Sequence, residues 1–405
     1  MQRDNSVHVL LTVTGVDQPG ITAALTSVLA HSQTPLLDIE QVVVHGQLTL
    51  CFLVALDILN PKGELILKDL FFAARQKGQN LEYRMIDQQN YLVSNTLSRQ
   101  YAITVMGSPV TAMAMNQLSS ILSSHEANIS SIRRLSNDDQ LSSLEVLVQI
   151  ASDDEAIKRL KEDLMQQLSS CGIDIALQRE SLTRRSKRLV VLDMDSTLIQ
   201  VEVIDELADY YGVKDEVALI THEAMNGRYD FGESLKKRVA LLKGLPSSYL
   251  IELAKSLPLD PGARELITVL KGLGYKVGII SGGFHVAADM LKEILGLDFA
   301  YANRLETSNG VLTGQVIEPI VDAEKKADLL EWIAHKEQIP LDQTIAIGDG
   351  ANDALMLARA GLGIAFHAKP ILKKAASTSV SSGGLERILY FLGMSARDIR
   401  EFLQK

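Results

Sequence analysis

The chain has 405 residues, which is too long for one ordinary hydrophobic core and predicts two to four domains. Its 46% hydrophobic and 22% charged residues are typical of a folded, soluble protein, and its formal net charge of −10 argues against general nucleic-acid binding. The two cysteines argue against a disulfide framework. The polar start "MQRDNSVH" has no apolar signal core, and no apolar run approaches the ~20 residues of a membrane span, so we expect a cytoplasmic protein without membrane contact.

The first half contains a faint internal repeat, in which "LLTVTG" at 10–15 matches "AITVMG" at 102–107. Each copy has the pattern strand, helix, strand, strand, helix, strand, which is the βαββαβ order of ferredoxin-like domains. In the second copy we expect strands at 101–106, 129–135, 141–150 and 173–178, with helices at 111–125 and 153–170. These copies predict one domain over 1–90 and another over 91–180.

The segment "RESLTRRSKR" at 179–188 is polar and strongly basic. Because the chain as a whole is acidic, we interpret it as a solvated linker rather than a nucleic-acid-binding arm. It marks the start of a third domain, residues 181–405.

The third domain alternates apolar β runs with helical stretches. The runs "LVVL", "YKVGII", "TIAIG" and "LGIAF" predict a parallel sheet that is covered by helices on both faces. Residues 200–258 instead predict several helices with no strand between them. Because they follow the first strand directly, they would form a helical cap over its end.

Polar residues follow three of these strands, at the carboxyl ends where parallel sheets bind ligands. The groups are Asp193-x-Asp195-x-Thr197, Ser281-Gly282-Gly283, and "GDGAND" with Asp349, Asn352 and Asp353. Carboxylates that meet at one edge repel each other unless a cation binds between them. Oxygen ligands without nearby His or Cys favour Mg²⁺.

The spacing of Asp193 and Asp195 indicates a second role besides metal binding. Residues i and i+2 of extended chain point to the same side, so one carboxylate could attack a phosphorus atom while the other protonates the leaving oxygen. The turn "SGGF" offers N–H groups and the Ser281 hydroxyl to a phosphate, and Lys326 could add a positive charge. Each piece alone is common, and it is their order along successive strand ends that makes the set specific.

These residues resemble the four motifs of the haloacid dehalogenase superfamily, in the form found in the phosphoserine phosphatase family. The resemblance rests on "LDMDSTLI", "IISGGF", Lys326 and "IGDGANDALML", and it covers about 185–398. The front half resembles two tandem ACT domains, which are small ferredoxin-like modules that bind amino acids. "GVDQPGI" at 15–21 fits the ACT turn after the first strand, whereas the second copy has "GSPVTAM".

The resemblance implies a Rossmann-like α/β core with a helical cap, preceded by two ACT domains, and it gives each site residue a role. Asp193 would be the nucleophile and a Mg²⁺ ligand, and Asp195 the general acid and base with its carbonyl on the metal. The other implied roles are metal binding by Asp349, phosphoryl or substrate binding by Ser281, Gly282, Lys326 and Asn352, and orientation of Lys326 or a metal-bound water by Asp353. Thr197 would steady the loop. In the cap, Glu202 would pair with a substrate ammonium and Arg238 with its carboxylate, between apolar walls from Met225 and Phe231.

The expected function is therefore Mg²⁺-dependent hydrolysis of O-phospho-L-serine to L-serine and phosphate through an aspartyl-phosphate, the last step of serine biosynthesis. Serine is the expected ligand of the ACT domains, where it would lower activity, and a homodimer is expected because ACT modules commonly pair edge to edge. Two alternatives stay open. One is another phosphomonoesterase or a phosphotransferase on the same core, and the other is an amino-acid sensor whose rear half is catalytically idle.

Overall fold

The computed structural model describes residues 8–86, 99–136, 141–151, 153–368, 372 and 376–404. The chain divides into two compact units, Met1–Ser98 and Arg99–Lys405. The domain boundary that the sequence predicts between residues 90 and 91 lies outside the described residues. Among the described helices, none has both the length and the apolar character that spanning a bilayer would require.

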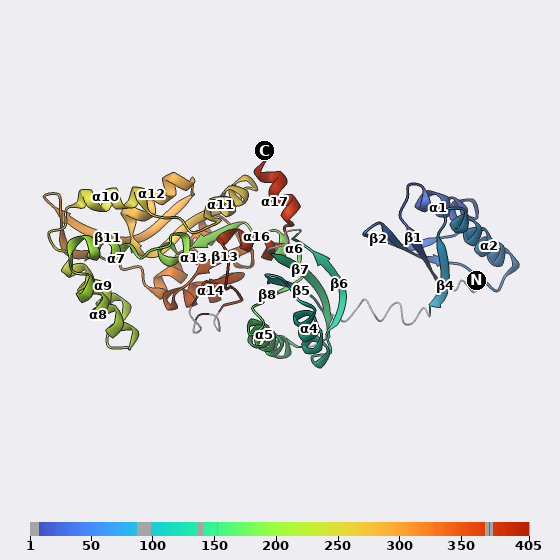
Figure 1. The fold of residues 1–405 in the computed structure, drawn as a ribbon, viewed down its shortest axis with the longest axis horizontal. Helices are drawn as coiled ribbons and strands as arrows, with labels where there is room; N and C mark the ends of the chain where they lie inside the picture. The colour runs from blue at the N-terminus through green and yellow to red at the C-terminus, as the bar shows by residue number, and fades with distance from the viewer. Residues whose placement is uncertain are drawn as a thin grey trace. The chain divides into compact units, whose positions relative to one another are not determined.

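The first unit is a four-stranded antiparallel sheet with two helices (Figure 1). Its elements are β1 (His8–Val16), α1 (Ile21–His31), β2 (Leu36–Val44), β3 (Gln47–Ala55), α2 (Pro61–Gln76) and β4 (Asn80–Ile86), and its strand order is β2-β3-β1-β4. Alternate residues of β1, such as Val9 and Leu11, are fully buried and share a core with Leu25 of α1 and Leu70 of α2. The predicted βαββαβ order is confirmed.

The second unit begins with the same fold. Its elements are β5 (Arg99–Gly107), α4 (Ala112–Ser124), β6 (Asn128–Arg134), β7 (Ser142–Ile150), α5 (Asp154–Ser169) and β8 (Asp174–Arg179). Both helices begin at side-chain caps, because Thr111 and Asp153 each accept a hydrogen bond from a backbone N–H of the first turn. These bounds agree with the predicted ranges to within a residue or two.

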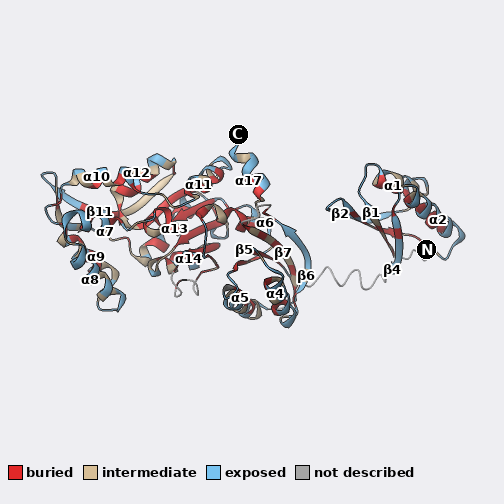
Figure 2. Ribbon diagram, in the orientation of Figure 1, coloured by how far each residue is buried: buried red, intermediate tan, exposed pale blue. Residues whose placement is uncertain are grey.

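The rest of the second unit is a parallel α/β core. The parallel strands are β9 (Leu189–Leu192), β10 (Lys276–Phe284), β11 (Phe299–Ser308), β13 (Thr344–Gly348), β14 (Leu362–Phe366) and β15 (Thr378–Val380), and β12 (Val311–Ile317) runs antiparallel to β11. The flanking helices are α11 (Ala263–Gly272), α12 (His285–Leu295), α13 (Ala323–Lys336), α14 (Ala354–Arg359), α16 (Ile388–Phe391) and α17 (Ala396–Leu403). Figure 2 shows the central strands as buried, which is why their sequences are apolar without alternation.

The cap consists of α7 (Val203–Tyr211), α8 (Lys214–Met225), α9 (Phe231–Leu241) and α10 (Ser247–Ser256). Its two connections to the core pair with each other, through a bridge between Ile199 and Leu259 and a hydrogen bond from the N–H of Gln200 to the carbonyl of Pro258 (2.9 Å). The helical cap that the sequence predicts after the first strand is confirmed. The prediction missed strands β11, β12 and β15, and the β11–β12 hairpin packs against α9 of the cap.

The second ACT fold and the core share one sheet, with the strand order β12-β11-β10-β9-β13-β14-β15-β8-β5-β7-β6. The connection is the antiparallel pair β15–β8, in which Thr378 lies opposite Ala176. The interpretation of 179–188 as a solvated linker is wrong in part, because Arg184 of the short helix α6 (Leu182–Arg185) is only 2% exposed. Its guanidinium binds Glu145 of β7 at 2.6 Å and Glu180 at 2.6 Å, which holds the basic segment on the second ACT fold. Lys187 of the same segment donates to the carbonyl oxygen of Asp342 in the core.

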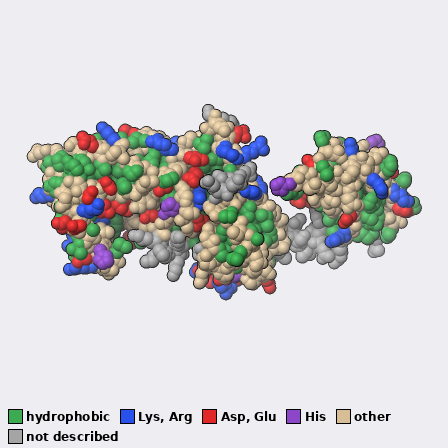
Figure 3. All heavy atoms as spheres, in the orientation of Figure 1, with side chains coloured by type: hydrophobic (Ala, Val, Ile, Leu, Met, Phe, Trp, Pro, Cys, Tyr) green, Lys and Arg blue, Asp and Glu red, His purple; other side chains and the backbone are tan. Residues whose placement is uncertain are grey.

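On the visible face of the second unit, acidic and basic side chains are interspersed and no continuous basic stripe is seen (Figure 3).

Candidate active site

The first strand of the core positions both aspartates of "LDMDST". All four residues of β9 are fully buried, and Asp193 follows them at 4% exposure. The backbone is extended at Asp193 (ψ 160°) and at Asp195 (ψ 133°), whereas Met194 between them has helical dihedral angles, so the pair does not lie on one continuously extended segment. Met194 between them is fully buried in the hydrophobic core. The chain then turns at Ser196, whose φ of 57° reverses its direction towards the cap.

Lys326 holds Asp193 from the neighbouring helix α13. Its Nζ lies 2.9 Å from Oδ2 of Asp193 and 2.8 Å from Oδ1 of Asp353, and its side chain is fully buried. Burial lowers the pKa of Lys326, but the charges of Asp193 and Asp353 outweigh it and the net pKa is raised. The two carboxylates therefore favour the charged ammonium beside the predicted nucleophile.

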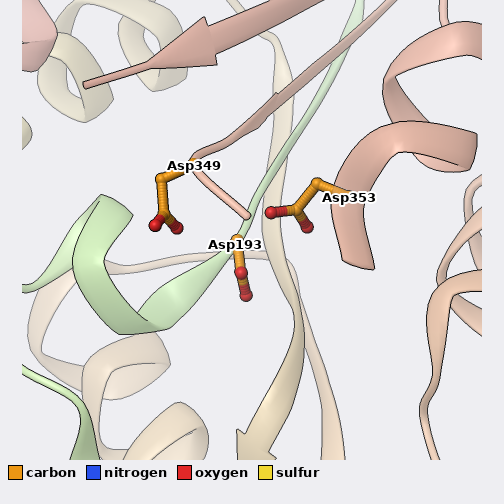
Figure 4. A group of neighbouring side chains, drawn as sticks. All are labelled: Asp193, Asp349 and Asp353. Carbon is orange, nitrogen blue, oxygen red and sulfur yellow. The ribbon is translucent and has the colours of Figure 1, made fainter. Parts of the chain in front are cut away.

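Three carboxylates converge at this sheet edge. One oxygen each from Asp193, Asp349 and Asp353 lies within 4.8 Å of the others, and Figure 4 shows these side chains together. Burial, followed by the charges of Asp193 and Glu202, raises the pKa of Asp349 to about 6. Lys326 alone does not balance this negative charge. An all-oxygen donor set with unbalanced charge fits a hard divalent cation such as Mg²⁺.

Asp195 sits beside this cluster in a separate hydrogen-bonding environment. Its Oδ1 accepts the N–H of Val203 at 2.9 Å, and its Oδ2 lies 3.4 Å from the Ser281 hydroxyl. Burial, and then the charge of Glu202, raises the pKa of Asp195 well above its ordinary value. A raised carboxyl pKa favours the protonated form, which suits a general acid.

The last residues of β10, 281–284, form the opposite wall. Their pairing with β11 is irregular between Ile280 and Phe284, and we call this stretch the glycine turn. Ser281 is 1% exposed, and its hydroxyl oxygen accepts a hydrogen bond from the N–H of Gly283 at 2.9 Å. A Cβ placed on Gly282 would lie 2.8 Å from Cζ of Phe231 and 3.6 Å from Nδ2 of Asn352, so both residues face this turn. A Cβ on Gly283 would lie 2.1 Å from Oδ2 of Asp195, which explains why only glycine fits there.

The remaining predicted loop residues are also brought to this edge. The Thr197 hydroxyl donates to Oδ1 of Asp349 at 3.1 Å, so Thr197 holds a carboxylate of the cluster. The N–H of Gly350 donates to Oδ2 of Asp353 at 3.1 Å, and Lys326 takes the other oxygen of Asp353. Asp353 therefore has contacts on both oxygens, which suits the orienting role that the sequence predicts for it.

The cap contributes charged groups above the cluster. The hydroxyl of Ser196 donates to Oε1 of Glu202 at 2.9 Å. Arg238 is half-buried, and burial lowers its pKa. The nearby charges of Glu202, Asp205 and Asp195 offset this only in part, so the net pKa is lowered. Glu202 and Arg238 therefore lie close enough for each to influence the charge of the other. Of the two predicted apolar walls, Phe231 packs on the core and Met225 is 66% exposed at the end of α8.

Asn303 is a site residue that the sequence analysis missed. It is 1% exposed, donates from Nδ2 to the carbonyl of Gly282 at 2.7 Å, and accepts the N–H of Val321 at 2.7 Å. It thus fixes the glycine turn to the segment that leads into the Lys326 helix. Asn303 lies on β11, a strand that was not predicted, and no motif marks it.

Comparison with known proteins agrees with this geometry. Residues 187–361 match the family model for haloacid dehalogenase-like hydrolases, and residues 7–84 and 100–178 each match a model for ACT domains. The chain is 41% identical over 393 residues to the phosphoserine phosphatase SerB2 of Mycobacterium tuberculosis, covering 97% of this chain and 95% of that protein. It is 42% identical over 393 residues to the phosphoserine phosphatase of Streptomyces coelicolor, covering 96% and 93%.

Two solved structures are similar over most of their length. A probable phosphoserine phosphatase from Vibrio cholerae has a TM-score of 0.56 and 35% identity, covering 74% of this chain and 88% of that one. A haloacid dehalogenase family hydrolase from Salmonella enterica has a TM-score of 0.61 and 28% identity, covering 72% and 98%. From the motifs, the fold and these relatives together, the chain is a phosphoric monoester hydrolase that belongs to the phosphoserine phosphatase family of haloacid dehalogenase-like hydrolases with two ACT domains.

Proposed function

We propose that the chain hydrolyses O-phospho-L-serine to L-serine and phosphate with Mg²⁺, as the last step of serine biosynthesis. The observation that carries the proposal is the pair Asp193 and Asp195. The first is held by a buried ammonium at 2.9 Å, and the second lies two residues on with a raised pKa. The named substrates of the two full-length relatives support the choice of phosphoserine.

In the first step, a carboxylate oxygen of Asp193 attacks phosphorus, and the bond from phosphorus to the serine oxygen breaks. Asp195 gives its proton to that oxygen, so serine leaves as a neutral alcohol. In the second step, Asp195 takes a proton from the water that attacks the aspartyl-phosphate, which releases phosphate and restores both carboxyl groups. Lys326, Ser281 and Asn352 bind the phosphoryl oxygens, and the N–H groups of the glycine turn assist them.

The metal would be held by carboxylate oxygens of Asp193 and Asp349 and by the carbonyl of Asp195. When bound, it supplies positive charge to the phosphoryl group and to the clustered carboxylates. Asp353 would remain paired with the ammonium of Lys326, and the hydroxyl of Thr197 would remain hydrogen-bonded to Asp349.

Substrate choice would rest on the cap. Glu202 pairs with the ammonium of phosphoserine, and Arg238 binds its carboxylate with two parallel hydrogen bonds. A phosphoester that lacks the ammonium or the carboxylate leaves Glu202 or Arg238 without a partner, which lowers its affinity.

The test measures phosphate release from O-phospho-L-serine and from a panel that includes phosphothreonine and sugar phosphates, with and without alcohol acceptors. Asp193→Asn should abolish turnover. Asp215→Asn, the same change on the exposed first turn of α8, should leave it unaltered. A sugar phosphate as the far better substrate would contradict the role given to the cap, and transfer to an alcohol would favour a phosphotransferase. Turnover by Asp193→Asn would contradict the mechanism.

We further propose that serine binds the ACT domains and lowers activity, and that the chain is a homodimer. The β2 edge of the first unit supports pairing between copies, because all nine of its residues are exposed and several are apolar. Since the second ACT fold shares a sheet with the core, the informative truncation starts at Arg99. Equal serine inhibition of the full chain and of this truncation would contradict regulation through the first ACT domain. A sedimentation mass of one chain for the intact protein would contradict the dimer.

A further inference from the structure

A cavity of about 600 Å³ lies where the second ACT fold joins the core. One wall comes from the end of β8 and the basic segment after it, and the other wall comes from two core loops. The lining residues are Leu177, Gln178, Arg179, Glu180, Ser181, Thr183, Arg184 and Lys187 on the first wall, with Asp342, Gly361, Leu362 and Ser377 on the second.

This cavity is distinct from the active site. Asp342 precedes β13, and Gly361 and Leu362 lie at the start of β14, whereas Asp349 follows the other end of β13. A five-residue strand is about 17 Å long, so a ligand here would be separated from the acidic cluster by the length of the sheet.

Lys187 is a buried cation in this wall. The residue is 6% exposed, and its Nζ donates to the carbonyl oxygen of Asp342. Within the ranges that the structure describes, Lys187 forms no ion pair with a carboxylate. An ammonium has three N–H donors, so two of them have no hydrogen-bond partner among the described residues. Burial lowers the pKa of Lys187 and the charge of Asp342 offsets this only in part, so the buried charge is costly.

The surroundings of Lys187 favour an anion. Arg184 also lines the cavity with its side chain 1% exposed, and its Nη1 is buried with no hydrogen-bond partner among the described residues. Glu180 is already bound by Arg184 at 2.6 Å and by Arg185 at 3.3 Å. Of the charged residues in the lining, three are basic and two are acidic, and the hydroxyls of Ser181, Thr183 and Ser377 add neutral donors.

We propose that this cavity binds a small oxyanion, a phosphate or carboxylate group, with Lys187 as its main charged contact. The ligand would touch the ACT wall and the core wall together. Its binding would therefore stabilise the joint made by β8 and β15, in addition to any ligand of the ACT turns.

The test is equilibrium dialysis of the Mg²⁺-loaded full chain against labelled inorganic phosphate. We expect two phosphates per chain in the wild type, because the catalytic site takes the other. Lys187→Met should bind one, Lys187→Arg should keep two, and Lys326→Met should keep the one at the joint. Lys158→Met, on the exposed surface of α5, is the matched control and should bind two.

Competition with succinate then identifies the ligand class. Displacement of the Lys187-dependent phosphate assigns the site to carboxylates as well, and persistence assigns it to phosphate groups. The proposal is overturned if the wild type binds one phosphate, or if Lys187→Met is folded by circular dichroism and still binds two.

Discussion

Replacing Gly283 by alanine tests the role of Asp195 without touching any reacting group. A Cβ at Gly283 would lie 2.1 Å from Oδ2 of Asp195 and 2.8 Å from Cε of Met194, while ordinary contacts begin at 3.4 Å. No positive φ is recorded for Gly283, so the backbone itself accepts alanine. The strain therefore falls on the carboxyl group.

The expected loss follows from how Asp195 is held. Its Oδ2 must retreat from 2.1 Å to at least 3.4 Å, but Oδ1 is fixed by the N–H of Val203 at 2.9 Å and the residue is 8% exposed. A displacement of roughly 1 Å of a catalytic group costs on the order of 10² in rate. That factor corresponds to about 2.7 kcal/mol in the activation free energy.

The assay is steady-state phosphate release from phosphoserine, with thermal unfolding measured alongside. We expect kcat to fall about 100-fold with a smaller change in KM, since proton donation is affected more than binding. Gly232→Ala is the control, because its Cβ would meet only ordinary contacts, 3.4 Å from Asp230 and 3.7 Å from Ile320. If Gly283→Ala keeps kcat within a few-fold of the wild type, Asp195 is not the positioned acid that the geometry indicates.

Four further predictions concern charged groups and the metal. Lys326→Met should lower kcat on the order of 10²- to 10³-fold, because it removes the buried cation at the phosphoryl site. Chelation of Mg²⁺ should abolish turnover until the metal is restored. An unchanged kcat in either assay would contradict the role given to Lys326 or to the metal. Arg184→Met should lower the free energy of unfolding in urea by about 3 kcal/mol, because it leaves Glu145 buried without its main partner. Adding Glu145→Leu should recover part of the loss. A double variant that is no more stable than Arg184→Met would refute this. Asp298→Asn should destabilise the protein by about 1 kcal/mol at pH 7. Burial raises the pKa of Asp298. The ammonium of Lys271 at 2.6 Å and a backbone N–H together lower it by more, so the net pKa is depressed. The stabilisation is therefore present above the ordinary carboxyl pKa and is lost as the pH falls through the depressed value, and urea titrations of wild type and variant should converge in that acidic range.

Much of the architecture could be predicted from local sequence patterns. The βαββαβ order, the cap and the parallel sheet all follow from apolar periodicity, and the two aspartates follow a buried run, "LVVL". Placing Asp193, Ser281 and Asp349 at one edge needed only the rule that parallel strands end together. Their assignment as catalytic residues came from the family resemblance, and it stays a prediction until the variants are measured.

The missed elements have a common cause. Strands β11 and β12 are partly exposed, so they lack the continuous apolar signal of β9, and β15 has only three residues. Asn303 could not be found because its two hydrogen bonds join residues about twenty positions away on either side.

The sequence by itself determined the elements, their order and the strand ends that carry the chemistry, because these depend on the spacing of neighbouring residues. Only the tertiary structure decided which charges are buried and with which partners. Lys326 meets Asp193 across 133 positions and Arg184 meets Glu145 across 39, as their residue numbers show. A basic segment such as 179–188 is indistinguishable from a solvated linker until a distant carboxylate is known to face it. The free energy of a charge depends on its surroundings in space, which the local pattern does not contain.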